Sequence, residues 1–228
     1  YTTLFRSDVK AKRTNLNAQE LGDPAKRAAQ WQRYDRNPVF DSGEVRDMVK
    51  DGVGQLTAMQ VSDGGWGWFS GYGEQSYPHT TAVVVHGLQV ALANDVAIVP
   101  GVLERGIEWL KGYQAEEVRR LKNAEKEVKP WKRLADDLDA LVYMVLADGK
   151  LENPEMREFL YRDRTHLSVY ANAMLGIGLQ IAGDGEKLAM VKRNIGQYLV
   201  QDDENQTAYL KLPSEGYWWC WYGGEIET

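Results

Sequence analysis

The chain has 228 residues, 43% of them apolar, which suits one well-packed domain and excludes a disordered chain. Its formal net charge of −6 excludes a global basic field of the kind that recruits nucleic acid. A single cysteine, Cys220, excludes an internal disulfide and a zinc site built from several cysteines. The most apolar stretch, residues 80–103, is interrupted by polar residues and by Pro100, so no membrane span is predicted.

Apolar residues recur at helical spacing along most of the chain, and alternating strand patterns are scarce, so the predicted class is all-α. The first helix begins at Asp23 and Pro24, an acid cap followed by a proline in the first turn, and stops before Pro38. The second starts at Glu44 and carries apolar residues to Met59. Later helices are predicted near residues 80–92, 102–113, 134–146, 165–181 (ended by Gly183) and 188–199.

Three segments share one pattern, which indicates a repeat: residues 49–56, 103–110 and 191–198. A glutamine follows each segment, and the first and third are followed by aromatic–glycine loops at residues 63–73 and 216–224. The predicted unit is an outer helix, a glutamine, an aromatic–glycine turn and a more apolar inner helix. Such units bury their faces by stacking on neighbours, and a ring of them forms an α/α toroid. We therefore expect a partial α/α toroid of helical hairpins.

The predicted organisation is an N-terminal helical lead-in at residues 1–43 and a toroid at residues 44–228. The chain begins with Tyr1, and a new helical pattern starts only at Glu225. We therefore expect a piece of a longer protein, with a toroid truncated at its C-terminal end.

Residues 60–68, QVSDGGWGW, resemble the glutamine–tryptophan turn of the terpenoid-cyclase and protein-prenyltransferase toroid superfamily. In that superfamily, the glutamine and the aromatic residue tie one hairpin to the next. The resemblance implies that the glycines supply positive φ angles and that an indole covers a helix end while its N–H finds an acceptor. A structural role is therefore predicted for Trp66 and Trp68.

A narrower resemblance runs from Asp63 to Leu88, where DGGWGWF is followed by a glycine-containing loop and TTAVVVHGL, and it includes Trp109-Leu110. These segments are similar to the thioester-containing domain of the bacterial alpha-2-macroglobulin and complement family. The resemblance implies a scaffold part of a protease-trapping endopeptidase inhibitor rather than an enzyme. It implies other domains of the same protein and target proteases as partners, and a periplasmic or extracellular location, while the net charge predicts no nucleic-acid partner.

The family's acylating motif is Cys-x-Glu-Gln, and this chain does not contain it. Tyr72 stands where Glu74-Gln75 would need a cysteine, so that segment is interpreted as a solvated loop. Cys220 lies between two tryptophans and is interpreted as a buried structural thiol. A thioester, if the parent protein has one, is expected upstream of Tyr1. No catalytic, cofactor-binding or metal-binding residue is predicted, and no cofactor.

Two other hypotheses remain open: an enzyme of the terpenoid-cyclase or prenyltransferase type, and a helical protein-binding module. The enzyme needs an acidic motif, and Asp136-Asp137-Leu138-Asp139 has neither of the expected spacings. Asp136 and Asp139 share a helix face and could hold a cation, but a solvated helix start is favoured. The charged run at residues 116–133 is interpreted as a solvated helix face. The three histidines are interpreted as loop or packing residues: His79, His86 and His166.

Overall fold

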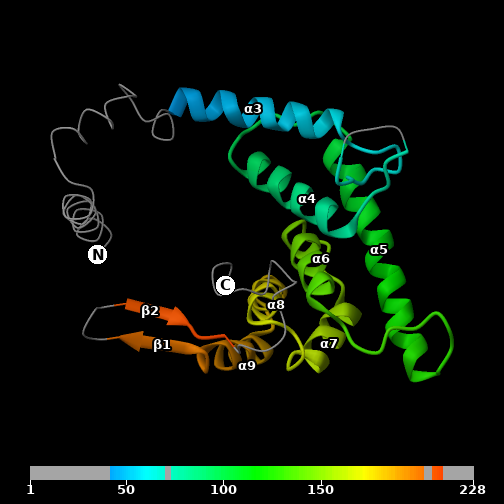
Figure 1. The fold of residues 1–228 in the computed structure, drawn as a ribbon, viewed down its shortest axis with the longest axis vertical. Helices are drawn as coiled ribbons and strands as arrows, with labels where there is room; N and C mark the ends of the chain where they lie inside the picture. Colours follow the sequence, from blue (N-terminus) through cyan, green and yellow to red (C-terminus); the bar gives the residue numbers. More distant parts are fainter. Residues whose placement is uncertain (1–41, 70–72, 203–206, 213–228) are drawn as a thin grey trace, which may run out of the picture. The chain divides into compact units, whose positions relative to one another are not determined.

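The computed structural model describes residues 42–69, 73–202 and 207–212 (Figure 1). The chain divides into two compact units, Tyr1–Val49 and Lys50–Thr228. The described part of the first unit is residues 42–49, the beginning of one helix. The helix predicted from Asp23 and the aromatic segment around Cys220 lie outside the described residues. The predicted domain boundary after residue 43 stays a prediction.

The described residues form helices and one short antiparallel hairpin, so the predicted all-α class is confirmed. The hairpin pairs Leu199 with Leu210 and Asp202 with Thr207. In chain order the elements are α3 Ser42–Ala58, α4 Pro78–Ala93, α5 Val102–Glu125, α6 Asp137–Asp148, α7 Pro154–Asp163, α8 Val169–Ala182, α9 Gly185–Gly196, β1 Leu199–Asp202 and β2 Thr207–Leu210.

Within the second unit, the apolar helices form one row and the more charged helices pack against it (Figure 1). Helix α6 packs between α4 and α8, while α5 packs on α4 and α9 on α8. Every residue of α6 from Asp139 to Ala147 is buried, as expected of a helix that is apolar on all sides. The predicted alternation of outer and more apolar inner helices is therefore present in α3, α4, α5 and α6.

Polar caps place the ends of the central helices. The Asp136 carboxylate accepts from Leu138 and Asp139 backbone N–H groups, and the Asp139 carboxylate accepts from the Asp136 N–H in return. The Ser168 hydroxyl accepts from the Ala171 N–H and begins α8. Gly183 ends α8 in the left-handed region, at φ 74°, as the sequence predicts.

The second and third copies of the predicted repeat differ from the first. Gln114 does not lie in a turn, because α5 continues to Glu125 with Val118 and Leu121 on its buried side. Gln201 lies in β1, since the chain turns into a hairpin after α9 instead of extending that helix to Leu199. Helix α7 was also missed by apolar spacing, although Asn153-Pro154 is a good helix start: the Asn153 side chain caps the helix.

Candidate functional site

The turn between α3 and α4 is tied to α5 by Gln60. Its Nε2 donates to the carbonyls of Gly64, at 2.9 Å, and Val102, at 2.8 Å. Its Oε1 accepts a hydrogen bond from Arg105. One side chain thus holds the turn closed and attaches it to the first residues of α5. The predicted role of this glutamine in joining one hairpin to the next is confirmed.

Trp66 covers the C-terminal end of α3. Its side chain is buried at 2% exposure, and its Nε1 donates to the Leu56 carbonyl at 2.7 Å. Leu56 lies in the last turn of α3, where carbonyls lack an intrahelical donor, so the indole N–H satisfies one of them. The Trp66 backbone N–H donates to the Thr81 hydroxyl at 2.9 Å. Both predictions for this residue, burial over a helix end and a partner for its N–H, are confirmed.

Asp63 connects the turn to α5 through a second tryptophan. Its Oδ1 accepts from the Gly65 N–H at 3.1 Å and the Ser76 hydroxyl at 2.6 Å, and its Oδ2 accepts from Trp109 Nε1 at 3.0 Å. Partial burial raises the pKa of Asp63, but hydrogen bonds from Ser76, Gly65 and Trp109 outweigh it and hold the pKa below its ordinary value. We call the side chains of Gln60, Asp63 and Trp66 the turn node.

The rest of the aromatic–glycine segment faces solvent. Trp68 is 56% exposed and Phe69 is 76% exposed, so the two tryptophans of this turn have different surroundings. Glu74 and Gln75 lie in a loop, as interpreted, and Gln75 is exposed while Glu74 is less so. Glu74 is half-buried, and its Oε1 accepts from the Trp68 backbone N–H at 2.8 Å. The acid folds back over the turn because Gly67 carries no side chain in that space.

A buried ionic cluster, which the sequence pattern did not predict, joins α5 to α6. Lys132 Nζ lies 2.9 Å from Glu117 Oε2, and 2.7 Å from both Asp136 Oδ2 and Asp139 Oδ2. The side chains of Glu117 and Asp139 are almost completely buried. The interpretation of residues 116–133 as a solvated helix face therefore fails at Glu117, and the helix start at Asp136–Asp139 is present but not solvated at Asp139. The cation held by Asp136 and Asp139 is the Lys132 ammonium.

Three carboxylates surround the Lys132 ammonium, and Glu117 is also paired with Arg120, whose Nη1 lies 3.2 Å from Glu117 Oε1. Burial raises the pKa of Asp139 to about 7; the Asp136 carboxylate adds to the rise and Lys132 opposes it. Burial lowers the pKa of Lys132, but the charges of Asp139 and Asp136 outweigh it and raise that pKa above its ordinary value. Burial is the main cause of the rise at Asp139, whereas the neighbouring carboxylates are the cause of the rise at Lys132.

The histidines lie apart from this cluster. His86 is half-buried in α4, with its Nδ1 3.3 Å from Asp148 Oδ2. His79 is half-buried at the start of α4, and burial lowers its pKa. His166 is exposed before α8, with Nδ1 3.5 Å from the Thr165 hydroxyl. Across the described residues, no three His, Cys, Asp or Glu side chains are grouped so that they could hold a metal ion.

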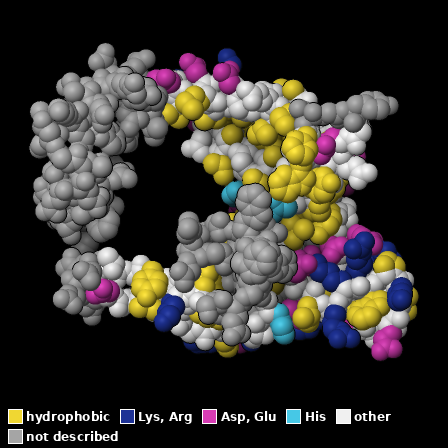
Figure 2. Space-filling view, viewed as in Figure 1, with side chains coloured by type: hydrophobic (Ala, Val, Ile, Leu, Met, Phe, Trp, Pro, Cys, Tyr) yellow, Lys and Arg dark blue, Asp and Glu magenta, His cyan; other side chains and the backbone are white. Residues whose placement is uncertain are grey.

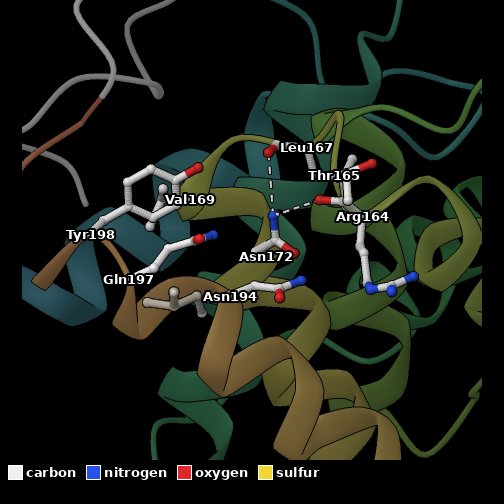
Figure 3. A pocket seen from close by; sticks show the side chains of 9 residues that line it. Arg164, Thr165, Leu167, Val169, Asn172, Asn194, Gln197 and Tyr198 are labelled. Atoms are coloured by element: carbon white, nitrogen blue, oxygen red, sulfur yellow. Dashed lines mark hydrogen bonds between the residues drawn. The ribbon is translucent and has the colours of Figure 1, made fainter.

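A polar cavity of about 300 Å³ opens between the N-terminal end of α8 and the C-terminal end of α9 (Figure 3). Asn172 lines it from α8, and Asn194 and Gln197 line it from the end of α9. These residues match no known motif in spacing or type, so the sequence pattern does not predict the cavity. The remaining lining residues are Arg164, Thr165, Leu167, Val169, Ile195 and Tyr198.

The fold and the turn node define a class of protein: an array of packed helical hairpins in which an aromatic–glycine turn connects α3 and α4 and is bonded to α5. No protein-family model matches the chain. Over 67 residues, 29% of this chain, it is 36% identical to alpha-2-macroglobulin of Thermotoga maritima. The predicted resemblance to bacterial alpha-2-macroglobulin is therefore confirmed.

Two solved structures of Escherichia coli alpha-2-macroglobulin are similar to this chain. The native conformation gives a TM-score of 0.50 with 22% identity, covering 73% of this chain and 10% of that one. The native crystal structure from domain MG7 to the C-terminus gives 0.49 with 23% identity, covering 67% and 24%. The likeness to the native conformation concerns the fold alone. The match covers 4% of the length of the Thermotoga protein, so this chain spans only a small part of that relative.

None of the helices in the described ranges is both long and apolar enough to cross a membrane.

Proposed function

We propose that this chain is part of a bacterial alpha-2-macroglobulin-like endopeptidase inhibitor, in which it supplies scaffold for the thioester-type toroid domain and performs no catalysis itself. The observation that carries the proposal is the turn node within a chain 36% identical to alpha-2-macroglobulin over 67 residues. Gln60 and Trp66 are satisfied by backbone carbonyls, which is the environment of structural residues and leaves neither side chain available to a substrate.

The proposed role is to transmit a rearrangement. In this family, a protease cleaves a bait segment elsewhere in the protein, and the target is then caged or acylated. A domain that moves as one body during such a change needs its helices firmly joined. The turn node joins α3 to α5, the Trp66 backbone N–H joins the turn to Thr81 of α4, and the Lys132 cluster joins α5 to α6. The partners are then the other domains of the parent protein and the trapped protease, in the periplasm or outside the cell.

The test uses the whole parent protein with a protease and two substrates, a large protein and a small chromogenic peptide. Caging predicts that the parent slows cleavage of the large substrate and leaves cleavage of the small one almost unchanged. The 228-residue chain alone, as the control, is expected to slow neither. If the chain alone slowed cleavage of both substrates equally, the scaffold role would be contradicted. If the parent slowed neither, its role as a protease inhibitor would be contradicted.

The enzyme hypothesis makes the opposite prediction for the chain itself. A cyclase or prenyltransferase would convert squalene or a prenyl diphosphate, with or without magnesium. We expect product no higher than in a heat-denatured control. Product formation above that background would replace the scaffold proposal.

A further inference from the structure

The cavity between α8 and α9 has walls of mixed chemistry. Leu167 and Val169, which precede and begin α8, line it with buried apolar side chains, and Ile195 of α9 adds a third. Asn194 and Gln197 add carboxamides from the end of α9 (Figure 3). An occupant with a large apolar body and one hydrogen-bonding group fits such walls, and a tryptophan side chain combines the two.

The charge of Arg164, which also lines the cavity, is directed to Tyr161. Its Nη1 donates to the Tyr161 carbonyl at 2.8 Å, and its guanidinium carbon lies 4.3 Å from the centroid of the Tyr161 ring. In Figure 3 this side chain runs away from the carboxamides of α9. The other lining residues are uncharged, so the cavity does not require a charged occupant. Its volume of about 300 Å³ is at the lower end of the ~300–1,000 Å³ of ligand pockets and suits one large side chain.

The chain returns to this cavity after the hairpin of β1 and β2. The Lys211 backbone N–H donates to the carbonyl of Tyr198 at 2.8 Å, and Tyr198 lines the cavity. The hairpin is therefore an insertion whose two ends meet at the end of α9. The residues that follow lie outside the described ranges and include an aromatic run from Tyr217 to Tyr222. Roughly 25 Å of extended chain separates Lys211 from Trp219, so this run can reach the cavity.

The first copy of the repeat shows what occupies the end of an outer helix. There, Trp66 Nε1 donates to the carbonyl of Leu56 in the last turn of α3. The repeat segments at residues 49–56 and 191–198 align Leu56 with Tyr198. The third copy should therefore hold an indole at the end of α9, where the cavity lies.

The two aromatic–glycine loops identify this indole. Trp66-Gly67-Trp68-Phe69 in the first loop aligns with Trp219-Cys220-Trp221-Tyr222 in the other. With the hairpin set aside, Trp219 follows the end of α9 at nearly the spacing at which Trp66 follows the end of α3. Trp219 is thus the counterpart of the buried Trp66, and Trp221 is the counterpart of the exposed Trp68.

We propose that the cavity between α8 and α9 is the docking site for Trp219 of the same chain. The indole ring packs on the apolar wall, and its Nε1–H meets the carboxamides of Asn194 and Gln197. Docking attaches the aromatic run to the end of α9, as Trp66 attaches the first aromatic–glycine turn to α3. The site goes beyond the inhibitor scaffold and does not depend on it, since it is defined by contacts within this chain.

The cysteine next to Trp219 provides the test. In the 228-residue chain, Gln197→Cys places a second thiol at the cavity, and Lys192→Cys places one on the exposed surface of α9 outside it. A disulfide needs Cα atoms within about 7 Å of each other, and docking of Trp219 holds Cys220 near Gln197. Under mild oxidation, we expect an intramolecular disulfide to form about tenfold faster in Gln197→Cys than in Lys192→Cys, as measured by mass spectrometry after thiol blocking.

Two tryptophan variants in the Gln197→Cys chain identify the occupant. Trp219→Ala is expected to slow the disulfide to the rate of Lys192→Cys, whereas the matched control Trp221→Ala is expected to leave it unchanged. Circular dichroism checks that each variant is folded, and the comparison of the two cysteine variants does not depend on either tryptophan substitution. The proposal is overturned by equal rates in the two cysteine variants or by an unchanged rate in folded Trp219→Ala. A disulfide that links two chains would also overturn it, because a second copy would then be the occupant.

Discussion

Replacing Trp66 with alanine should destabilise the fold by roughly 3–5 kcal/mol, the usual cost of truncating a buried tryptophan. The structure supports a value in that range for two reasons. The side chain is 2% exposed, so its removal leaves a cavity against α5, where Gly106 meets the ring. The Leu56 carbonyl also loses its donor at the end of α3. Because small proteins are stable by only about 5–15 kcal/mol, a loss of this size is a large fraction of the total.

The assay is urea unfolding followed by far-ultraviolet circular dichroism, with two companion variants. Trp66→Phe keeps an aromatic ring and removes the N–H, so we expect a loss of about 1–3 kcal/mol from the unsatisfied carbonyl. Trp68→Ala is the matched control from the same turn; at 56% exposure it should change the free energy of unfolding by no more than about 0.5 kcal/mol. A loss below about 1 kcal/mol for Trp66→Ala, or one no larger than that of Trp68→Ala, would refute the proposed packing.

Three further predictions concern glycines and carboxylates, each measured by urea unfolding. Gly106→Ala should destabilise by about 1–3 kcal/mol, because its Cβ would lie 2.7 Å from a Trp66 ring carbon; Gly112→Ala on the same helix meets nothing within 4 Å and should stabilise by up to about 1 kcal/mol. Similar effects of the two would contradict the close approach of α5. Because folding lowers the pKa of Asp63, its carboxylate stabilises the fold above its unfolded pKa, and this stability is lost as pH falls through the lower folded pKa. Asp63→Asn should remove this contribution. Asp139 has the opposite effect on the pH dependence of stability, because its pKa is raised in the folded state. The free energy of unfolding should fall as pH rises from about 4 towards about 7, and Asp139→Asn should flatten that slope. An unchanged pH profile in either variant would show that the carboxylate is not perturbed as described.

The sequence predicts the helices well because their signals are local. Apolar spacing predicts α3, α4, α6 and α8, side-chain caps begin α6 and α8, and Gly183 ends α8 as predicted. The turn node was also predictable, because its glutamine, acid and tryptophan lie within seven consecutive residues. The residues that form these elements lie close together in the chain and therefore leave a readable pattern, although the turn node also contacts Val102 and Trp109 of α5.

The features that sequence could not predict depend on contacts between distant residues. Glu117 looks like part of a solvated face until Lys132 folds back to it, fifteen positions later. The polar cavity requires the end of α9 to lie beside the start of α8, and no local pattern relates Asn172 to Gln197. The end of α5 was placed too early because charged residues outnumber apolar ones in its last turns, while Val118 and Leu121 still pack inward.

The position of α6 between its neighbours has a consequence for how the second unit opens. A helix buried on every side and packed against α4, α5, α7 and α8 can release its backbone amides to solvent only when most of those helices separate. The hairpin of β1 and β2, whose residues are exposed or half-buried, can open alone. Amide hydrogen-exchange rates should therefore differ between the two elements. Exchange in α6 should require global unfolding, whereas exchange in the hairpin should require only local opening.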